Sequence, residues 1–133
     1  MRKALLALSY FIFLSTVLFS TSCATIQEKN ESTVKDVVEK YWLIRLEDNY
    51  RESYKSEYKE GLPSFDIYKD KAAAIKKIKI MSYKIKNVRI EGEKAIIDVE
   101  FSLLLPITVK PVHQILSDEW LYRDGRWWHI FPQ

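Results

Sequence analysis

The sequence predicts an α+β domain in which two N-terminal helices pack on a curved, four-stranded antiparallel sheet. Two observations support this prediction. Apolar residues recur at helical spacing from residue 33 to about residue 77, and at alternating positions from residue 83 onward. The dipeptide Asp124-Gly125 separates two aromatic segments and is typical of a two-residue hairpin. One face of such a sheet is exposed to solvent. The helices are therefore expected to cover the opposite face and to enclose a cone-shaped interior.

The chain of 133 residues is long enough for one domain and too short for two with separate cores. Residues 33–133 are expected to form that domain. There are 21 lysines and arginines against 18 aspartates and glutamates, a net charge of +3. This weak charge argues against a nucleic-acid-binding surface, so no nucleic acid is expected as a partner. The basic residues between Lys69 and Arg89 are interpreted as a solvated sheet face.

The first helix is expected to begin at a capping box made by Thr33 and Asp36. Its apolar residues follow the helical repeat, and the helix is expected to end near Asn49. A continuation of this helix is left open, because it would align three tyrosines in one stripe: Tyr50, Tyr54 and Tyr58. Such a stripe is more typical of a packing face than of a ligand-binding wall.

A second helix is expected after the break at Gly61-Leu62-Pro63. Ser64 is its predicted N-cap, and the helix extends from Phe65 to about Lys77. One face of this helix is apolar and is expected to pack against the rest of the domain. It contains Phe65, Tyr68, Ala72 and Ile75.

Four strands follow, and their turns predict antiparallel pairing. The first covers residues 83–90, with a bulge near Asn87 because the apolar positions change side there. After a turn at residues 91–93, the second strand alternates polar residues with apolar ones, which are expected to be buried. The apolar set is Ala95, Ile97, Val99, Phe101, Leu103 and Leu105.

The third strand is expected over residues 113–123 and the fourth over residues 126–131. Pro106 and Pro111 limit the second strand, because proline cannot donate to a sheet hydrogen bond. They indicate an edge, a bend or a crossing loop before the third strand.

The N-terminus has the pattern of an export signal. Met1-Arg2-Lys3 is a short basic segment, and residues 4–19 are an uncharged, mainly apolar run. This run is shorter than the roughly 20 residues of a membrane-spanning helix and fits the core of a signal peptide. Cys23 follows directly after three small residues and, as the only cysteine, cannot form an intramolecular disulfide. We therefore expect residues 1–22 to be a signal peptide.

The position of Cys23 resembles the lipobox of bacterial lipoproteins. In that family the cysteine thiol is alkylated with diacylglycerol and the leader is cut before it, which implies a lipid anchor on Cys23. Residues 23–32 would then be the lipidated cysteine and a polar tether. Ser20 departs from the pattern, because the lipobox usually has an aliphatic residue three positions before the cysteine. An ordinary cleaved signal peptide and an uncleaved anchor helix are the alternatives.

The lipobox resemblance also implies a location. Lipoproteins of this kind are exported and attached to the cell membrane by their acyl chains. Ala24 is not the aspartate that retains such proteins in the inner membrane of enteric bacteria. In a host with two membranes, the outer membrane, on its periplasmic side, is therefore the expected location.

The C-terminal segment Asp118–Ile130 combines an aromatic strand, an Asp-Gly turn and a Trp-rich end. It resembles the last hairpin of the nuclear-transport-factor-two-like superfamily, and residues 64–68 and 83–105 resemble the middle of the same families. The resemblance covers most of residues 33–132 and implies a cone-shaped α+β domain. The superfamily includes isomerases, dehydratases, epoxide hydrolases, assembly modules and lipoproteins of no known activity. The resemblance therefore implies a fold rather than a reaction.

Enzymes of this superfamily typically place an Asp–His pair or a carboxylate in the cone. Asp98 is out of phase with its apolar neighbours, so it is expected to face outward. Of the two histidines, His113 stands at a strand start. His129 lies on a Trp-rich strand, where a surface or scaffold role is more common than that of a base. The sequence has no metal-ligand cluster, phosphate-binding loop or serine nucleophile motif, so neither a cofactor nor a metal is expected.

Aromatic residues are the remaining candidates for a pocket or a partner surface. They either line a pocket for an apolar ligand or fill the cone, and filling is favoured. The consecutive Trp127 and Trp128 cannot both face inward, and the outer one is a candidate contact for a partner or a second copy through the sheet face. The candidate set comprises Trp42, Tyr54, Trp120, Trp127, Trp128 and His129.

The sequence therefore predicts a non-enzymatic, lipid-anchored module that binds a partner or a small ligand at the cell envelope. One alternative is a small membrane-anchored enzyme of the isomerase or hydrolase type, and another is a structural subunit of an envelope complex. A buried ionisable residue in an accessible cavity would favour the enzyme. A cone-shaped interior filled by aromatic side chains, without a buried ionisable residue, would favour the binding module.

Overall fold

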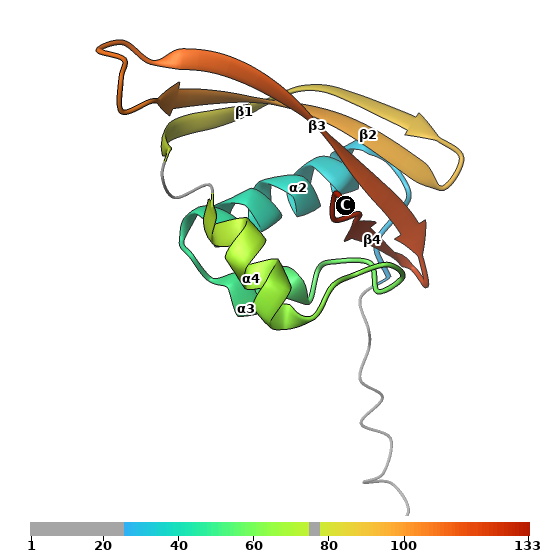
Figure 1. Cartoon of the computed structure of the whole chain (residues 1–133). Helices are drawn as coiled ribbons and strands as arrows, with labels where there is room; N and C mark the ends of the chain where they lie inside the picture. The colour runs from blue at the N-terminus through green and yellow to red at the C-terminus, as the bar shows by residue number, and fades with distance from the viewer. Residues whose placement is uncertain (1–25, 75–77) are drawn as a thin grey trace, which may run out of the picture.

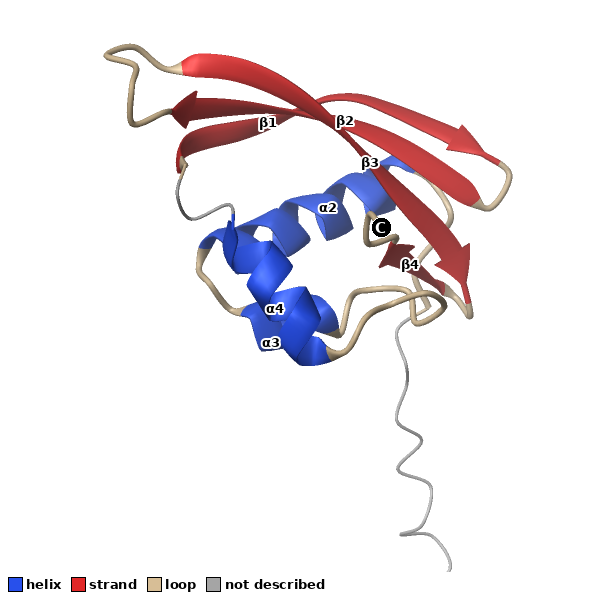
Figure 2. Ribbon diagram, in the orientation of Figure 1, coloured by secondary structure: helices blue, strands red, loops and turns tan. Residues whose placement is uncertain are grey.

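The computed structural model describes residues 26–74 and 78–133. The predicted signal peptide, Cys23 and residues 75–77 lie outside this described part. Helices lie along the concave face of one curved sheet, so the domain is α+β as predicted (Figure 1; Figure 2). The helices are α2 (Glu31–Leu46), α3 (Tyr50–Tyr54) and α4 (Phe65–Ala73), and the strands are β1 (Lys79–Glu91), β2 (Lys94–Leu104), β3 (Val112–Arg123) and β4 (Arg126–His129).

The sheet is an antiparallel meander with the strand order β1-β2-β3-β4. The pairing of β1 with β2 shifts register twice, between Ile80 and Ser82 and between Ile85 and Asn87. The second shift is the predicted bulge. Because bulges bend a strand and increase its twist, both shifts favour the curvature with which the sheet arches over the helices in Figure 1.

The main core lies between α2 and the concave face of β2. Along β2 every second residue from Ala95 to Leu103 is buried, as the alternation predicted. Leu105, which was expected to extend this buried face, lies beyond the end of β2 and is half-buried. The core is completed by residues from α2, β3 and β4: Val34, Val38, Tyr41, Trp42, Trp120 and Trp127.

The N-cap of helix α2 lies three residues earlier than predicted, at Asn30 rather than at Thr33. Its capping box is made by Asn30 and Thr33, not by Thr33 and Asp36. The Asn30 side chain accepts from the Thr33 backbone N–H at 2.9 Å, and the Asn30 N–H donates to the Thr33 hydroxyl. Thr33 is therefore the third residue of the helix, and the reciprocal bonds satisfy two donors that the helix start would otherwise leave free.

The continuation of α2 through three tyrosines, which the sequence left open, does not form. Asp48 has a positive φ of 61°, which ends the first helix, and the side chain of Asn49 then caps the short helix α3. Tyr58 lies beyond the end of α3, so it does not share a helical stripe with Tyr50 and Tyr54. The domain has three helices in its described part where two were predicted.

Helix α4 begins at Phe65 with Ser64 as its N-cap, although the Ser64 side chain makes no capping hydrogen bond. The helix ends at Ala73, before the predicted end near Lys77. Tyr68 and Ala72 are buried on its predicted apolar face, and Ile75 and Lys77 lie outside the described residues.

The predicted two-residue turn joins β3 to β4. Asp124 and Gly125 have positive φ angles of 53° and 74°, as a type I′ turn requires. β4 ends at His129 rather than at Phe131, because the chain then leaves the sheet and Phe131 packs on Tyr68 of α4.

Replacing Gly125 by alanine is expected to destabilise the domain by about 1–2 kcal/mol. The new Cβ would strain the backbone at its φ of 74° and would lie 3.3 Å from Cγ2 of Ile26. Gly92→Ala is the matched control, because φ is 64° there but the added Cβ meets no atom within 4 Å. Urea unfolding measures both variants. An equal loss of stability would show that the contact with Ile26 contributes nothing.

The segment before α2 lies against this hairpin. The Gln27 N–H donates to the Gly125 carbonyl, and the Trp127 N–H donates to Oε1 of Gln27, both at 2.8 Å. The Tyr122 hydroxyl donates to the Gln27 carbonyl. The part of the expected tether that the structure describes is therefore bound to the domain. No helix among the described residues combines the length and the apolar character needed to cross a bilayer.

Candidate functional site

A buried histidine lies between two buried carboxylates on the concave side of the sheet. Nδ1 of His129 lies 2.6 Å from Oε2 of Glu57, and Nε2 lies 3.8 Å from Oδ1 of Asp118. All three side chains are almost completely buried. Buried charges are stable only when they are paired, so these three groups act as one electrostatic unit.

Three elements bring these residues together. His129 pairs with Trp120 across β3 and β4, and Asp118 precedes Trp120 by two positions, so all three face the concave side. Glu57 comes from the loop after α3, which forms an isolated bridge with His129 on the other edge of β4. The Tyr58 N–H donates to the His129 carbonyl at 2.8 Å and fixes this loop.

The histidine cluster continues into a chain of hydrogen bonds beneath α2. The Tyr41 hydroxyl donates to Oε1 of Glu57 at 2.6 Å. Nη1 of Arg45 donates to the hydroxyls of Tyr41 and Tyr68 at 3.0 and 3.1 Å. At the other end, Nε1 of Trp42 donates to Oδ2 of Asp118 at 2.7 Å. Each carboxylate therefore has a partner besides His129.

The two carboxylates determine the protonation of His129. Burial alone would lower its pKa, but the hydrogen bonds and charges of Asp118 and Glu57 outweigh burial and raise the pKa to about 9. Burial and the neighbouring Glu57 also raise the pKa of Tyr41 well above its usual value. At neutral pH His129 is therefore an imidazolium whose two N–H groups face carboxylates. The cluster then contains two cations, His129 and Arg45, and two anions.

The stability of the domain is expected to fall as the pH rises from about 6.5 to about 9. The pKa of His129 is higher in the folded state than the ordinary value of 6.5, so its contribution is complete below pH 6.5 and disappears above pH 9. The total loss is roughly 3 kcal/mol, and urea unfolding across this range measures it. The His129→Asn variant is the control and should lack this loss. A wild-type stability that is constant from pH 6.5 to 9 would contradict the charged state of His129.

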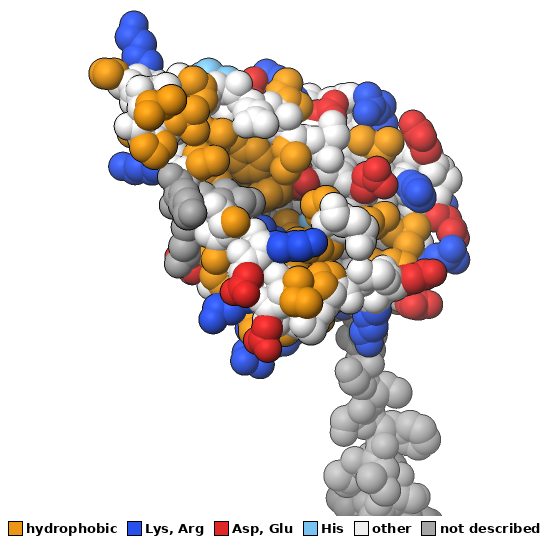
Figure 3. All heavy atoms as spheres, in the orientation of Figure 1, with side chains coloured by type: hydrophobic (Ala, Val, Ile, Leu, Met, Phe, Trp, Pro, Cys, Tyr) orange, Lys and Arg blue, Asp and Glu red, His pale blue; other side chains and the backbone are white. Residues whose placement is uncertain are grey.

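Two neighbouring hollows open between the sheet and the helices. The larger, about 550 Å³, has His129 and Asp118 in its wall together with Leu116, Lys71 and Phe131. The smaller, about 320 Å³, lies under the start of β1, and both hollows share Trp42 and Arg45. Figure 3 shows this hollowed face with hydrophobic side chains gathered under the sheet.

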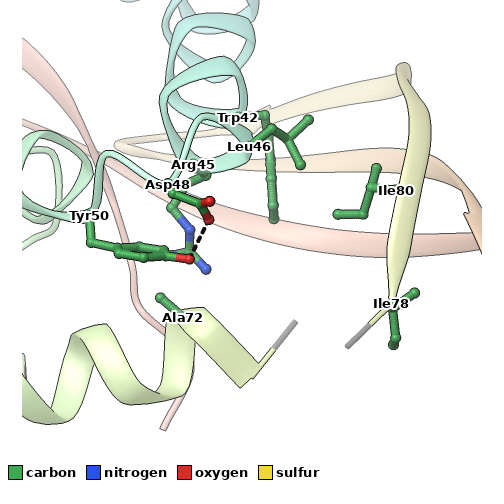
Figure 4. A pocket seen from close by; sticks show the side chains of 8 residues that line it. All are labelled: Trp42, Arg45, Leu46, Asp48, Tyr50, Ala72, Ile78 and Ile80. Carbon is green, nitrogen blue, oxygen red and sulfur yellow. Dashed lines mark hydrogen bonds between the residues drawn. The ribbon is translucent and has the colours of Figure 1, made fainter. Parts of the chain in front are cut away.

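Figure 4 shows that the smaller hollow has two kinds of wall. Arg45, Asp48 and Tyr50 line one side, where the Tyr50 hydroxyl donates to Oδ1 of Asp48 at 2.6 Å. The other side is apolar and consists of Trp42, Leu46, Ile78 and Ile80, while Ala72 of α4 lies beneath Tyr50. A site of this kind can accept a mainly apolar ligand and orient it by a polar group.

The structure brings only some of the predicted site residues together. Trp42 and His129 line the larger hollow. Trp120 is fully buried in the core and does not line it. Trp127 is buried while Trp128 is half-buried on the outer face beneath Arg126, as the strand alternation predicted. Tyr54 lies elsewhere, in edge contact with Phe65 and Tyr68.

The two other candidates for chemistry lie on the outer face of the sheet. Asp98 faces outward as predicted, and its carboxylate accepts from the Ser117 hydroxyl at 2.7 Å. This hydrogen bond is the main cause of a lowered pKa of Asp98. His113 is exposed near the start of β3. Neither residue reaches the hollows.

Glu57 and Asp118 were not among the predicted site residues. The phase of Asp118 could have identified it, because it lies two residues before Trp120 and therefore faces the same side of β3. Glu57 gives no such signal, since it lies in an irregular loop whose position depends on pairing with β4. Within residues 26–74 and 78–133, no three histidine, cysteine or acidic side chains are placed to hold a metal ion.

Comparison with known proteins supports the fold. No family model matches the chain, and no curated protein is similar to it in sequence. A SEC-C motif-containing protein from Rhodopseudomonas palustris has a similar structure, with a TM-score of 0.57 at 8% identity over 71% of this chain and 73% of that one. A protein named as an NTF2-like transpeptidase from Campylobacter jejuni gives a TM-score of 0.53 at 11% identity over 74% and 97%. This second likeness supports an NTF2-like fold for the chain and, at such low identity, nothing beyond the fold.

Proposed function

We propose that this chain is a lipid-anchored cell-envelope protein whose domain binds a partner or a small ligand without catalysing a reaction. The anchoring part rests on the sequence, in which an export-type leader is followed directly by Cys23. The docking of Gln27 on the β3–β4 hairpin adds a consequence. The four residue steps from Cys23 to Gln27 span at most about 14 Å, so the lipid would hold the domain close to the membrane surface.

The non-catalytic part rests on one observation, the position of His129 between two buried carboxylates, with Nδ1 2.6 Å from Glu57 and Nε2 3.8 Å from Asp118. A general base needs an unprotonated nitrogen within reach of the substrate near neutral pH. His129 faces a carboxylate at each nitrogen, and its pKa of about 9 keeps it protonated. Its role is therefore to neutralise Glu57 and Asp118 and to hold the loop after α3 on β4.

Anchoring is tested by fractionating cells that produce the full chain and by mass spectrometry of the membrane fraction. The wild-type protein should be found there with diacylglycerol on Cys23, and Cys23→Ala should abolish both the modification and the lipid anchorage. Ser22→Ala is the matched control, because it keeps a small residue before the cysteine. An unmodified Cys23 in the mature protein, or a Cys23→Ala variant that stays anchored, would end the proposal.

A small membrane-anchored enzyme of the isomerase or hydrolase type is the second candidate. The observation in its favour is that His129 and Asp118 both line the 550 Å³ hollow. An ionisable pair at the wall of a cavity is the usual form of an acid–base site. This candidate requires His129 to lose its proton near pH 7, so the titration of His129 separates the two proposals.

A further inference from the structure

An apolar surface of the hollows is exposed to water. Leu116 on β3 is 43% exposed and Leu46 at the end of α2 is 37% exposed, although both line the space beneath the sheet. Ile78 and Ile80 at the start of β1 lie on the same side. Apolar side chains gathered in a concave site are typical of a ligand-binding surface.

Cationic groups lie beside this apolar surface. The Arg45 side chain belongs to the walls of both hollows. Lys71 of α4 lines the larger hollow, with Nζ 5.8 Å from the centre of the Phe131 ring. A cation next to an apolar wall recognises an anionic group at the end of an apolar body.

Two of the acidic side chains that border the hollows have hydrogen-bonding or ionic partners within the domain. The carboxylate of Asp48 accepts from the Tyr50 hydroxyl. The carboxylate of Asp118 accepts from Trp42 and faces His129. Glu119 also borders the larger hollow, but it is exposed and alternates with Asp118 along β3. The groups in the walls that can hold an anion are the guanidinium of Arg45, whose Nη1 is bonded to the hydroxyls of Tyr41 and Tyr68, and the amine of Lys71.

We propose that the hollows bind a single-chain amphipathic carboxylate of the fatty-acid class. Its alkyl chain lies along Trp42, Ile80 and Leu116, and its carboxylate is held by Arg45 and Lys71. This inference rests on the ligand-binding part of the proposed function and does not depend on the anchor at Cys23. Hollows of 320 and 550 Å³ match the volume of small-molecule sites.

Binding of radiolabelled dodecanoate to the full-length protein tests the proposal. The protein is purified from membranes and transferred to amphipol, and empty amphipol is the blank. Binding should be saturable above the blank. Unlabelled dodecanoate should displace the label, and dodecyltrimethylammonium, which has the same chain and a cationic head, should displace it about tenfold less effectively.

Leu116→Asp places a charge on the proposed chain-binding wall and should weaken dodecanoate binding about tenfold. Ile115→Asp is the matched control, because Ile115 is also exposed but faces the outer side of the same strand. It should bind as the wild type does. Lys71→Gln should weaken the binding of dodecanoate several-fold and leave the binding of dodecanol unchanged. All three positions are solvent-exposed, so we expect the variants to fold, and circular dichroism of each one checks this.

Three results would overturn the proposal: no saturable binding above the blank, equal displacement by the cationic amphiphile, or equal losses in Leu116→Asp and Ile115→Asp. The result of the dodecanoate-binding experiment is independent of whether Cys23 carries a lipid. A protein that is lipidated on Cys23 but binds no dodecanoate disproves this inference alone. A protein that binds dodecanoate but is not lipidated disproves the anchor alone.

Discussion

Replacing Glu57 by alanine is expected to lower the free energy of unfolding by about 3–5 kcal/mol. The substitution removes the carboxylate that accepts from Tyr41 and faces Nδ1 of His129, both at 2.6 Å. The imidazolium of His129 is then left in the core with Asp118 as its remaining acidic partner. Urea unfolding at pH 7 measures the loss.

Glu60→Ala is the matched control for Glu57→Ala, because Glu60 lies in the same loop region but is exposed. It should change the stability by less than about 0.5 kcal/mol. Glu57→Ala and His129→Ala should be strongly non-additive in a double-mutant cycle, since each removes the partner of the other. Additive losses would show that the two side chains do not act as a unit.

Trp127→Ala is expected to destabilise the domain by about 3–5 kcal/mol, because the substitution empties a large volume of the core. Trp127 is 1% exposed and packs in edge contact with Tyr122. Its neighbour Trp128 is the control. Trp128 faces the outer side, where the guanidinium carbon of Arg126 lies 3.8 Å from the ring centre.

Trp128→Ala should lower the stability by about 1 kcal/mol or less, the value of an exposed cation–π contact. Thermal or urea unfolding of the two variants gives the comparison directly. If the two consecutive substitutions had the same effect, the alternation that places Trp127 inside and Trp128 outside would be refuted.

The sheet could be predicted because its signals are local. In β2 the two-residue repeat assigns each side chain to a face without knowledge of the rest of the fold. In the last hairpin, Asp124-Gly125 supplies the positive φ angles that a two-residue turn needs. Both predictions are confirmed.

The helix boundaries were harder to predict because several residues compete for each one. Asn30 and Thr33 are both good N-caps, and the choice falls on Asn30 because its side chain reaches the Thr33 N–H. The break at Asp48 has neither glycine nor proline. It depends on an aspartate in the left-handed region and on Asn49, which caps a new helix.

The candidate site was predicted only in part. Trp42 and His129 were recognised from their residue types, and both line the larger hollow. The two carboxylates that define the state of His129 were missed. Asp118 comes from the preceding strand, and Glu57 from a loop 72 positions earlier in the chain. No local pattern reports a contact of that separation.

The most direct test of a charged, non-catalytic His129 is an NMR titration of its ring. Full-length protein with ¹⁵N-labelled histidine is followed from pH 5 to pH 10, and His113→Gln assigns the two rings. The structure predicts that His129 carries a proton on both nitrogens at pH 7 and loses one with a pKa of about 9. A His129 ring that is neutral at pH 7 would contradict this account and favour the enzyme.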